Sequence, residues 1–240
     1  MQSKLLRAFW LFCSLLPAGA LASDWHVILE NHWEFRAMIR KTQQDCWLAD
    51  GRSHCVQDGR VRLVRKDLGV VWRLNSKDKT YIEEKIEPPK AEPAKREVDF
   101  HTLGFDYEPS YDWQLKETGE PKQILGFPCR GFQADGDADF AEMTVKFWVC
   151  TEPALAISGA ENDLVLGEAG PANAILKEAL SKHPGSFILL IDSVLEPPIG
   201  DTNHRIISVL KLENAEAPAG IYEVPEGFKK SSPGKDQAAR

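Results

Sequence analysis

The chain has 240 residues, of which 43% are hydrophobic and 27% are charged, and its formal net charge at pH 7 is −7. A protein this acidic does not bind nucleic acid or anionic lipid headgroups through its bulk charge. Its hydrophobic and aromatic content is that of a globular protein, which excludes a disordered chain.

The first 22 residues carry the three parts of a cleavable export signal. Lys4 and Arg7 make a positive start, and residues 8–16 form an apolar run that is too short to span a bilayer, which takes about 20 apolar residues. Ala20-Leu21-Ala22 then fits the small-x-small rule for signal peptidase. We expect a signal peptide over 1–22, with an uncleaved N-terminal anchor as the alternative. The protein is then periplasmic or secreted, and no later stretch is apolar enough to cross a membrane.

Four cysteines remain after the signal: Cys46, Cys55, Cys129 and Cys150. An even number in an exported chain favours structural disulfides. Of the three pairings, we expect Cys46–Cys55 and Cys129–Cys150, because each pair brackets a turn-rich segment between strand-like runs. A four-cysteine zinc site is the competing interpretation, but it calls for close C-x-x-C pairs, which the sequence lacks.

Alternating apolar and polar residues predict strands along most of the chain. Residues 25–42 form two strands or one bent strand, and residues 45–86 form an antiparallel meander. Within this meander Val70, Trp72 and Leu74 share one face of a strand.

A segment rich in proline and charge, residues 87–112, is an exposed connector. It either divides two domains or is an insertion in one sheet, and we expect the second. A strand over 113–118 then ends in a turn at Gly119-Glu120-Pro121. Residues 127–134 and 140–150 form a hairpin.

In the second arm of that hairpin, Met143, Val145 and Phe147 share a face. One helix is expected from Pro171 to His183, where apolar residues recur at helical spacing. Strand-like runs follow, and the polar tail 229–240 is expected to be disordered.

Four local patterns in this order resemble a known family. The first runs from Val61-Arg62-Leu63 through Val70-Val71-Trp72-Arg73-Leu74-Asn75 to Lys79-Thr80-Tyr81, and the second is Thr118-Gly119-Glu120 with Ile124-Leu125-Gly126-Phe127-Pro128-Cys129-Arg130-Gly131-Phe132. The third is Phe147-Trp148-Val149, and the last is Ile221-Tyr222-Glu223-Val224-Pro225-Glu226-Gly227-Phe228. The chain resembles, over roughly 25–230, bacterial periplasmic proteins known only as a domain of unknown function, which are similar in fold to the lipoprotein-carrier (LolA-like) superfamily. The resemblance implies a mainly β, α+β fold. It would be a single domain over 23–228, with a curved antiparallel sheet or half-barrel whose concave face is closed by one or two helices. Relatives of that shape hold acyl chains or lipoproteins, or act as envelope-stress sensors.

Motifs of catalysis and cofactor binding are absent from the sequence. No G-x-S-x-G elbow, Walker loop or G-x-G-x-x-G occurs, and no two histidines form a close metal-binding pair. The carboxylates of residues 135–142 are spaced as in a calcium loop, but they lack the glycine and glutamate positions of an EF-hand. We expect no enzyme, no catalytic residue, no metal and no cofactor.

The sequence therefore predicts a non-enzymatic periplasmic protein that binds an acyl chain, a lipid or a lipoprotein in the concavity of the half-barrel. The alternation along two strands suggests six residues that could line this concavity, although alternation alone does not decide which face is the inner one. They are Val70, Trp72, Leu74, Met143, Val145 and Phe147. The alternative is an envelope interaction, assembly or stress-sensing protein with a filled core, which docks another envelope protein through residues 100–113 or a sheet edge. An enzyme with a convergent site is the third and weakest hypothesis.

Overall fold

The fold is known from a computed structural model, which describes residues 24–86, 111–138, 141–151, 164–197 and 200–232. The predicted signal peptide, almost all of the 87–112 insertion and the last residues of the tail lie outside the described residues. No described helix is long and apolar enough to cross a membrane.

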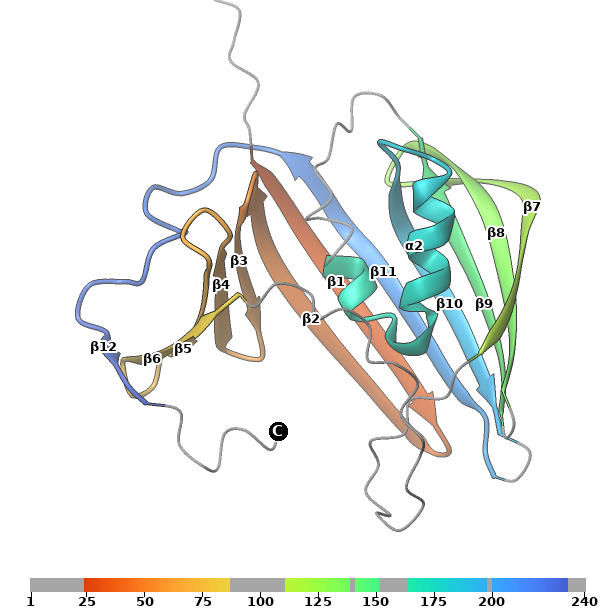
Figure 1. The fold of residues 1–240 in the computed structure, drawn as a ribbon, viewed down its shortest axis with the longest axis horizontal. Coiled ribbons are helices and arrows are strands. Elements are labelled where there is room, and N and C mark those ends of the chain that lie inside the picture. The colour runs from red at the N-terminus through yellow and green to blue at the C-terminus, as the bar shows by residue number, and fades with distance from the viewer. Residues whose placement is uncertain (1–23, 87–110, 139–140, 152–163, 198–199, 233–240) are drawn as a thin grey trace, which may run out of the picture.

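One open, curved sheet of 12 strands forms the body of the protein (Figure 1), in the order β12-β6-β5-β4-β3-β2-β1-β11-β10-β9-β8-β7. All neighbours pair antiparallel except β12 and β6. The strand bounds are β1 Trp25–Phe35, β2 Met38–Ala49, β3 Arg52–Gln57, β4 Arg60–Arg65, β5 Val70–Asn75, β6 Thr80–Lys85, β7 Asp112–Ile124, β8 Phe127–Ala138, β9 Ala141–Cys150, β10 Phe187–Glu196, β11 Asn203–Asn214 and β12 Lys229–Lys230. The predicted mainly β fold with a curved sheet is confirmed.

Tight turns connect the predicted meander. Asp58 and Gly59 join β3 to β4 with φ angles of 50° and 73°. Positive φ at both central residues of a two-residue turn matches the twist of the flanking strands, and Asp-Gly favours it. The meander over residues 45–86 is confirmed as the run from β2 to β6.

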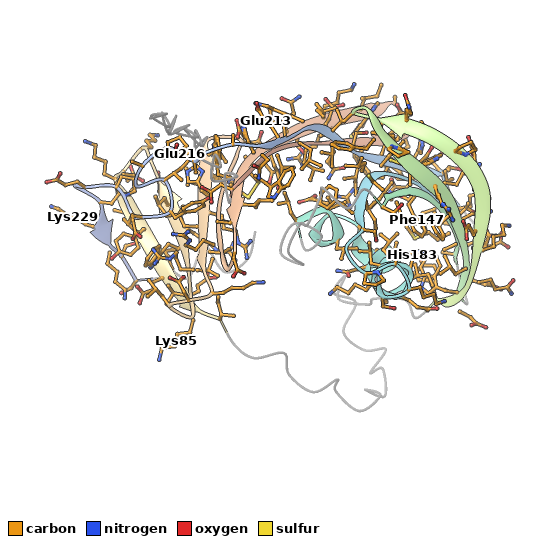
Figure 2. The ribbon with its side chains drawn as sticks, turned by 90° about the horizontal axis from the view of Figure 1, so that it is seen from above. Lys85, Phe147, His183, Glu213, Glu216 and Lys229 are labelled. Atoms are coloured by element: carbon orange, nitrogen blue, oxygen red, sulfur yellow. A yellow bond between two sulfur atoms is a disulfide. The ribbon has the colours of Figure 1, made fainter. Side chains whose placement is uncertain are left out.

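A short helical module lies inside the curve of the sheet (Figures 1 and 2). It comprises helical residues 164–167, the 3₁₀ turn η1 Gly170–Ala172 and the helix α2 Asn173–Ser181. Pro171 stands in the first turn, as predicted, where its missing N–H has no partner to lose. α2 buries Ile175, Leu176 and Ala179 against the core of the sheet.

Two local predictions differ from the structure. Gly119-Glu120-Pro121 does not end a strand, because β7 continues through it with a register irregularity between Glu117 and Pro121. Gly119, at φ 68°, supplies the backbone conformation that the irregularity needs. The structured chain also extends beyond 228, since Lys229 and Lys230 pair with β6.

One of the two expected disulfides is present. Cys46 and Cys55 lie opposite each other on β2 and β3, with their Cα atoms 4.2 Å apart, and their sulfurs are bonded. Cys129 and Cys150 also lie opposite each other, on β8 and β9, and both are buried, but no disulfide joins them in this structure. The second disulfide stays a prediction.

Candidate ligand-binding site

The six residues expected to line one concavity lie on opposite faces of the sheet. Cross-strand neighbours point to the same side of a sheet. The row Ile207, Ile191 and Phe147 therefore lies on the concave side, which α2 covers (Figure 2). The row Cys46, Cys55, Arg62 and Arg73 lies on that side too, reached through β1 and β2. Trp72 and Leu74 flank Arg73 along β5, so they point to the convex side.

The concave half of the predicted lining is already packed. Val145 and Phe147 are 0% exposed and Met143 is 7% exposed, and all three belong to the core cluster that includes Ile175 and Leu176 of α2. Phe147 stacks on Phe132, with ring centroids 5.4 Å apart. The helix therefore occupies the space that was predicted for a ligand.

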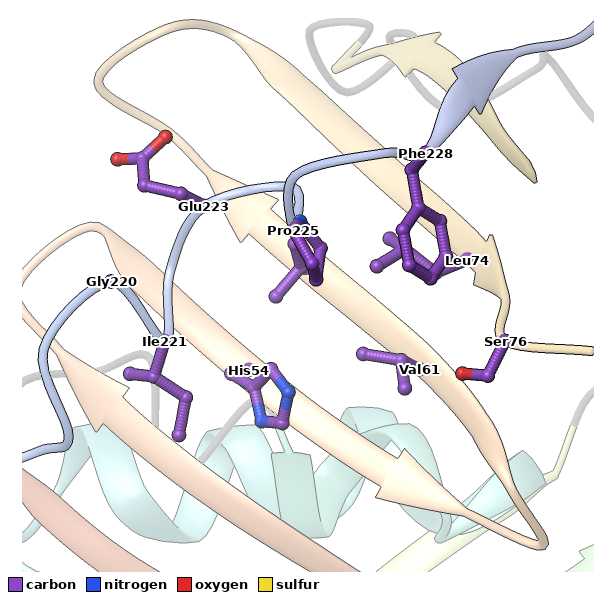
Figure 3. A pocket seen from close by; sticks show the side chains of 10 residues that line it. His54, Val61, Leu74, Ser76, Gly220, Ile221, Glu223, Pro225 and Phe228 are labelled. Carbon is purple, nitrogen blue, oxygen red and sulfur yellow. The ribbon is translucent and has the colours of Figure 1, made fainter. Parts of the chain in front are cut away.

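The convex half of the predicted lining faces the C-terminal segment. Residues 220–228, which we call the strap, cross β3, β4 and β5 and form with them a half-open cavity of about 210 Å³ (Figure 3). Of the predicted residues, only Leu74 lines this cavity. Its full lining is His54, Val61, Leu63, Leu74, Ser76, Gly220, Ile221, Glu223, Pro225 and Phe228.

Apolar side chains make most of the cavity wall. Val61 and Leu74 come from the sheet, and Ile221, Pro225 and Phe228 come from the strap (Figure 3). Strand alternation puts Val61, Leu63 and Leu74 on this face and Arg62 and Arg73 on the other. The cavity can therefore accept an apolar group of limited size.

His54 is the polar side chain that β3 adds to the cavity. Its Nδ1 is buried and has no hydrogen-bond partner among the described residues. Burial lowers the pKa of His54, although its own backbone and Asp45 act in the opposite direction. A neutral imidazole thus offers one hydrogen bond to a ligand in a site whose other polar side chains are Ser76 and Glu223.

Ionic and aromatic contacts hold the first part of the strap. The Arg65 guanidinium pairs with Asp67 at 2.7 Å and with Glu223, and it donates to the Tyr222 carbonyl at 3.4 Å. Hydrogen bonds to Asp67, and then to Glu223, raise the pKa of Arg65. Arg52 lies over the Tyr222 ring, 5.0 Å from its centroid.

The end of the strap is fixed through Glu83. Lys230 donates to Glu83 Oε1 at 2.7 Å, and Trp72 Nε1 donates to Glu83 Oε2 at 2.9 Å. The Lys230 ammonium, followed by the Trp72 indole, lowers the pKa of Glu83. Trp72, predicted as a lining residue, therefore helps to position the end of the strap.

A polar cluster on the concave face joins the helical module to the sheet. Glu168 accepts from Asn31 at 2.8 Å, from Gln44 at 2.8 Å and from Arg205 at 2.9 Å. Burial lowers the pKa of Arg205, and the charge of Glu168 opposes that shift. The charge of Glu168 is thus matched by one guanidinium and two amides.

In the described part of the chain, no group of three or more His, Cys, Asp or Glu side chains could hold a metal ion. Sequence reasoning missed His54, Ile221 and Phe228. His54 lies on a strand without clear alternation of apolar and polar residues. Residues 221–228 entered the sequence analysis only as part of the family resemblance. Their burial against β3 to β5 depends on contacts far apart in sequence.

No protein-family model matches the chain, and no curated protein matches it. Solved structures overlap with it at low similarity. A DUF1329 family protein from Desulfovibrio piger gives a TM-score of 0.32 at 11% identity, covering 85% of this chain and 91% of its own. A LolA superfamily protein from Nitrosomonas europaea gives 0.32 at 7% identity, covering 84% and 90%.

Two further solved structures differ in the share of their own length that aligns with this chain. An outer membrane lipoprotein-sorting protein domain from Vibrio parahaemolyticus gives a TM-score of 0.29 at 9% identity, covering 83% of this chain and 89% of its own. PNGF-II gives 0.40 at 10% identity over 89% of this chain, which spans only 31% of PNGF-II. TM-scores below 0.5 carry no argument about a ligand or an activity. The structural neighbours of the chain nevertheless include DUF1329 family and LolA superfamily proteins.

Proposed function

We propose that this protein is a non-enzymatic periplasmic binding protein, and that its ligand places a short apolar group in the cavity under the strap. The end of an acyl chain, from a lipid or a lipoprotein, has this chemistry. The observation that carries the proposal is the 210 Å³ cavity with its largely apolar wall. A dry apolar cavity of about 150 Å³ in another protein binds benzene, so the volume is sufficient for a chain end.

The energy of binding would come from the removal of apolar surface from water. Each methylene that enters the cavity contributes about 0.8 kcal/mol. A chain end of a few methylenes therefore gives only modest affinity, and a longer ligand must make further contacts outside the cavity. The disulfide between Cys46 and Cys55 supports the periplasmic location, because such bonds persist in oxidising compartments.

The proposal moves the ligand from the concavity to the convex face. α2 fills the concave face at Phe147, whereas the strap leaves a cavity at Leu74. The strap is held at its ends by side-chain contacts of Arg65 and Lys230 and by the short β12 pairing. Such a segment can release and re-form its contacts with less loss of buried surface than a core helix.

Native mass spectrometry of protein purified from the periplasm, followed by lipid extraction, tests the proposal. We expect a bound apolar species on the wild-type protein. Ile221→Trp fills the cavity from the strap side and should abolish the adduct. Leu210→Trp adds the same bulk at a site that is 43% exposed on β11, and should retain it. An adduct that survives in Ile221→Trp, or its absence from the wild-type protein, would contradict the proposal.

A second candidate function is supported by the packed concave face. With Val145 and Phe147 buried completely, that half of the protein has the filled core expected of an envelope interaction, assembly or stress-sensing protein. Recovery of an envelope protein partner by pull-down, from protein that carries no lipid, would favour this function over ligand carriage.

A further inference from the structure

Two arginines face each other on the concave side of the sheet. Arg62 of β4 lies directly opposite Arg73 of β5, and Arg62 is also the cross-strand neighbour of Cys55, part of the disulfide. Like charges directly opposite each other destabilise a sheet. The arrangement therefore calls for a reason other than stability.

Positive charge is concentrated on this part of the concave face. Strand alternation gives β3 to β6 twelve concave-side residues, among which are three arginines and one acidic residue: Ser53, Cys55, Gln57, Arg60, Arg62, Val64, Val71, Arg73, Asn75, Thr80, Ile82 and Glu84. The whole chain, in contrast, has 36 acidic and 29 basic residues. A local excess of arginine in an acidic protein marks a surface that is complementary to an anion.

The charge of Arg62 is not balanced within the described part of the protein. Arg73 pairs with Glu84 at 3.0 Å. Arg62 is exposed, and it forms no ion pair with any described carboxylate. Desolvation, and then the facing charge of Arg73, lower the pKa of Arg62, while Glu84 raises it. A guanidinium that faces a like charge and has no carboxylate partner of its own gains from an added anion.

We propose that Arg62, Arg73 and Arg60 form a binding site for a phosphate group on the concave face of β4 and β5. Arg60 is exposed and lies on the same side of β4 as Arg62, two residues earlier. Guanidinium groups donate in a planar fork that matches two phosphate oxygens, and two facing forks would hold one phosphate between them. The side-chain amide of Gln57 lies opposite Arg60 on β3 and can add a neutral donor, whereas Asn75, opposite Arg60 on β5, already donates to Asp78 at 2.8 Å.

This site is separate from the cavity under the strap. Arg62 and Arg73 point to the concave side, while Leu63 and Leu74, their neighbours in the chain, point to the convex side. Phosphate binding and apolar binding can therefore be lost independently. The phosphate group could be free or could belong to a lipid, and the two sources share the same recognition chemistry.

Calorimetric titration of the full mature chain with inorganic phosphate, with dihexanoylphosphatidic acid and with uncharged dihexanoylglycerol tests the proposal. We expect the phosphate-bearing lipid to bind at least about tenfold more tightly than dihexanoylglycerol, which corresponds to one charge-assisted hydrogen bond. Equal binding of inorganic phosphate identifies a free anion as the ligand, and tighter binding of the lipid identifies an amphiphile. Either result supports the site.

Variants separate the site from general charge effects. Arg62→Gln and Arg73→Gln should each remove the preference for phosphate. Arg62→Gln should also leave the melting temperature unchanged or raise it, because it ends the repulsion from Arg73. Arg130→Gln is the control, since Arg130 is an exposed arginine on β8 that pairs with Glu117 at 3.5 Å. Phosphate binding that persists in Arg62→Gln, or that is lost equally in Arg130→Gln, would overturn the proposal. A lower melting temperature in Arg62→Gln would do so too.

Discussion

Arg205 of β11 donates from Nη2 to Glu168 Oε2 at 2.9 Å, and this ion pair links the helical module to the centre of the sheet. Glu168→Gln keeps the size of the side chain but leaves the guanidinium of Arg205 without its charged partner. Loss of the charged partner of a half-buried group, here 30% exposed, costs about 1–2 kcal/mol, towards the lower end of the cost for a fully buried group. We expect a fall of that size in the free energy of unfolding, measured by urea denaturation.

The control for this variant is Glu178→Gln, which removes an exposed pair with Lys182 on α2. Exposed helical pairs of this spacing contribute about 0.3–0.5 kcal/mol. Equal effects of Glu168→Gln and Glu178→Gln would show that the Glu168 cluster contributes no more than a surface ion pair.

His54 makes stability depend on pH. Burial lowers its pKa in the folded protein, so the unfolded chain binds its proton more readily. The stability that neutral His54 provides is therefore complete above the unfolded pKa, about 6.5. It is lost as the pH falls from there towards the folded pKa. We expect the free energy of unfolding to fall less steeply between pH 7.5 and pH 5 in His54→Leu than in the wild-type protein.

The same pH series on a variant of a more exposed histidine is the control. Carboxyl groups also titrate over this pH range, and they contribute equally to the pH dependence of both variants. His204 is suitable, because its side chain is 35% exposed, compared with 16% for His26. Identical pH slopes for His54→Leu and the wild-type protein would mean that His54 is protonated equally in both states.

Trp113 of β7 covers Gly136 of β8. A Cβ atom at Gly136 would lie 2.6 Å from two carbons of the Trp113 ring, closer than such atoms approach in proteins. Gly136→Ala must displace the ring from the core cluster and should destabilise the protein by about 1–3 kcal/mol. Thermal unfolding measures this, and Trp113→Leu in the Gly136→Ala background should recover part of the loss. An alanine variant as stable as the wild type would contradict the contact.

The disulfide between Cys46 and Cys55 closes a short loop, with a sequence separation of 9. Replacement of both residues by serine should lower the free energy of unfolding by about 2–3 kcal/mol. Denaturation in dithiothreitol, which also reduces any bond between Cys129 and Cys150, should lower the stability by at least as much. A melting temperature that does not respond to the reductant would contradict a stabilising bond.

Unlike the Cys46–Cys55 pair, Cys129 and Cys150 should form a disulfide only if they are oxidised before the protein has folded. Burial, followed by the neighbouring Cys150, raises the pKa of the Cys129 thiol to about 12. The reactive thiolate is then scarce in the folded protein. We expect protein from an oxidising compartment to show no thiols in denaturant, and protein folded in the reduced state and then exposed to oxidant to keep two. Two thiols in both preparations would exclude the second disulfide.

Short-range patterns predicted much of the fold. The alternation of Val61 to Leu74 predicts the strands of a meander, and Pro171 with its apolar spacing predicts the helix. These features depend on residues that lie close together in the chain. The turn at Gly119 was predicted wrongly, because glycine and proline also allow a strand to continue through an irregularity.

The site was harder to predict, because alternation gives two faces without saying what covers them. Val70, Trp72 and Leu74 were grouped with Met143, Val145 and Phe147 on their pattern alone. The structure packs one group beneath a helix and the other beneath the strap. Only the order of the strands in the sheet relates the two patterns, and that order depends on contacts between distant segments.

The ends of the sheet have a consequence for association between molecules. At one margin β12 adds only two parallel residues to β6, and at the other β7 carries Pro121 and a register irregularity. A growing fibril needs a straight, unbroken row of backbone donors and acceptors. Neither margin offers one, so this long open sheet can remain a single copy without closing into a ring.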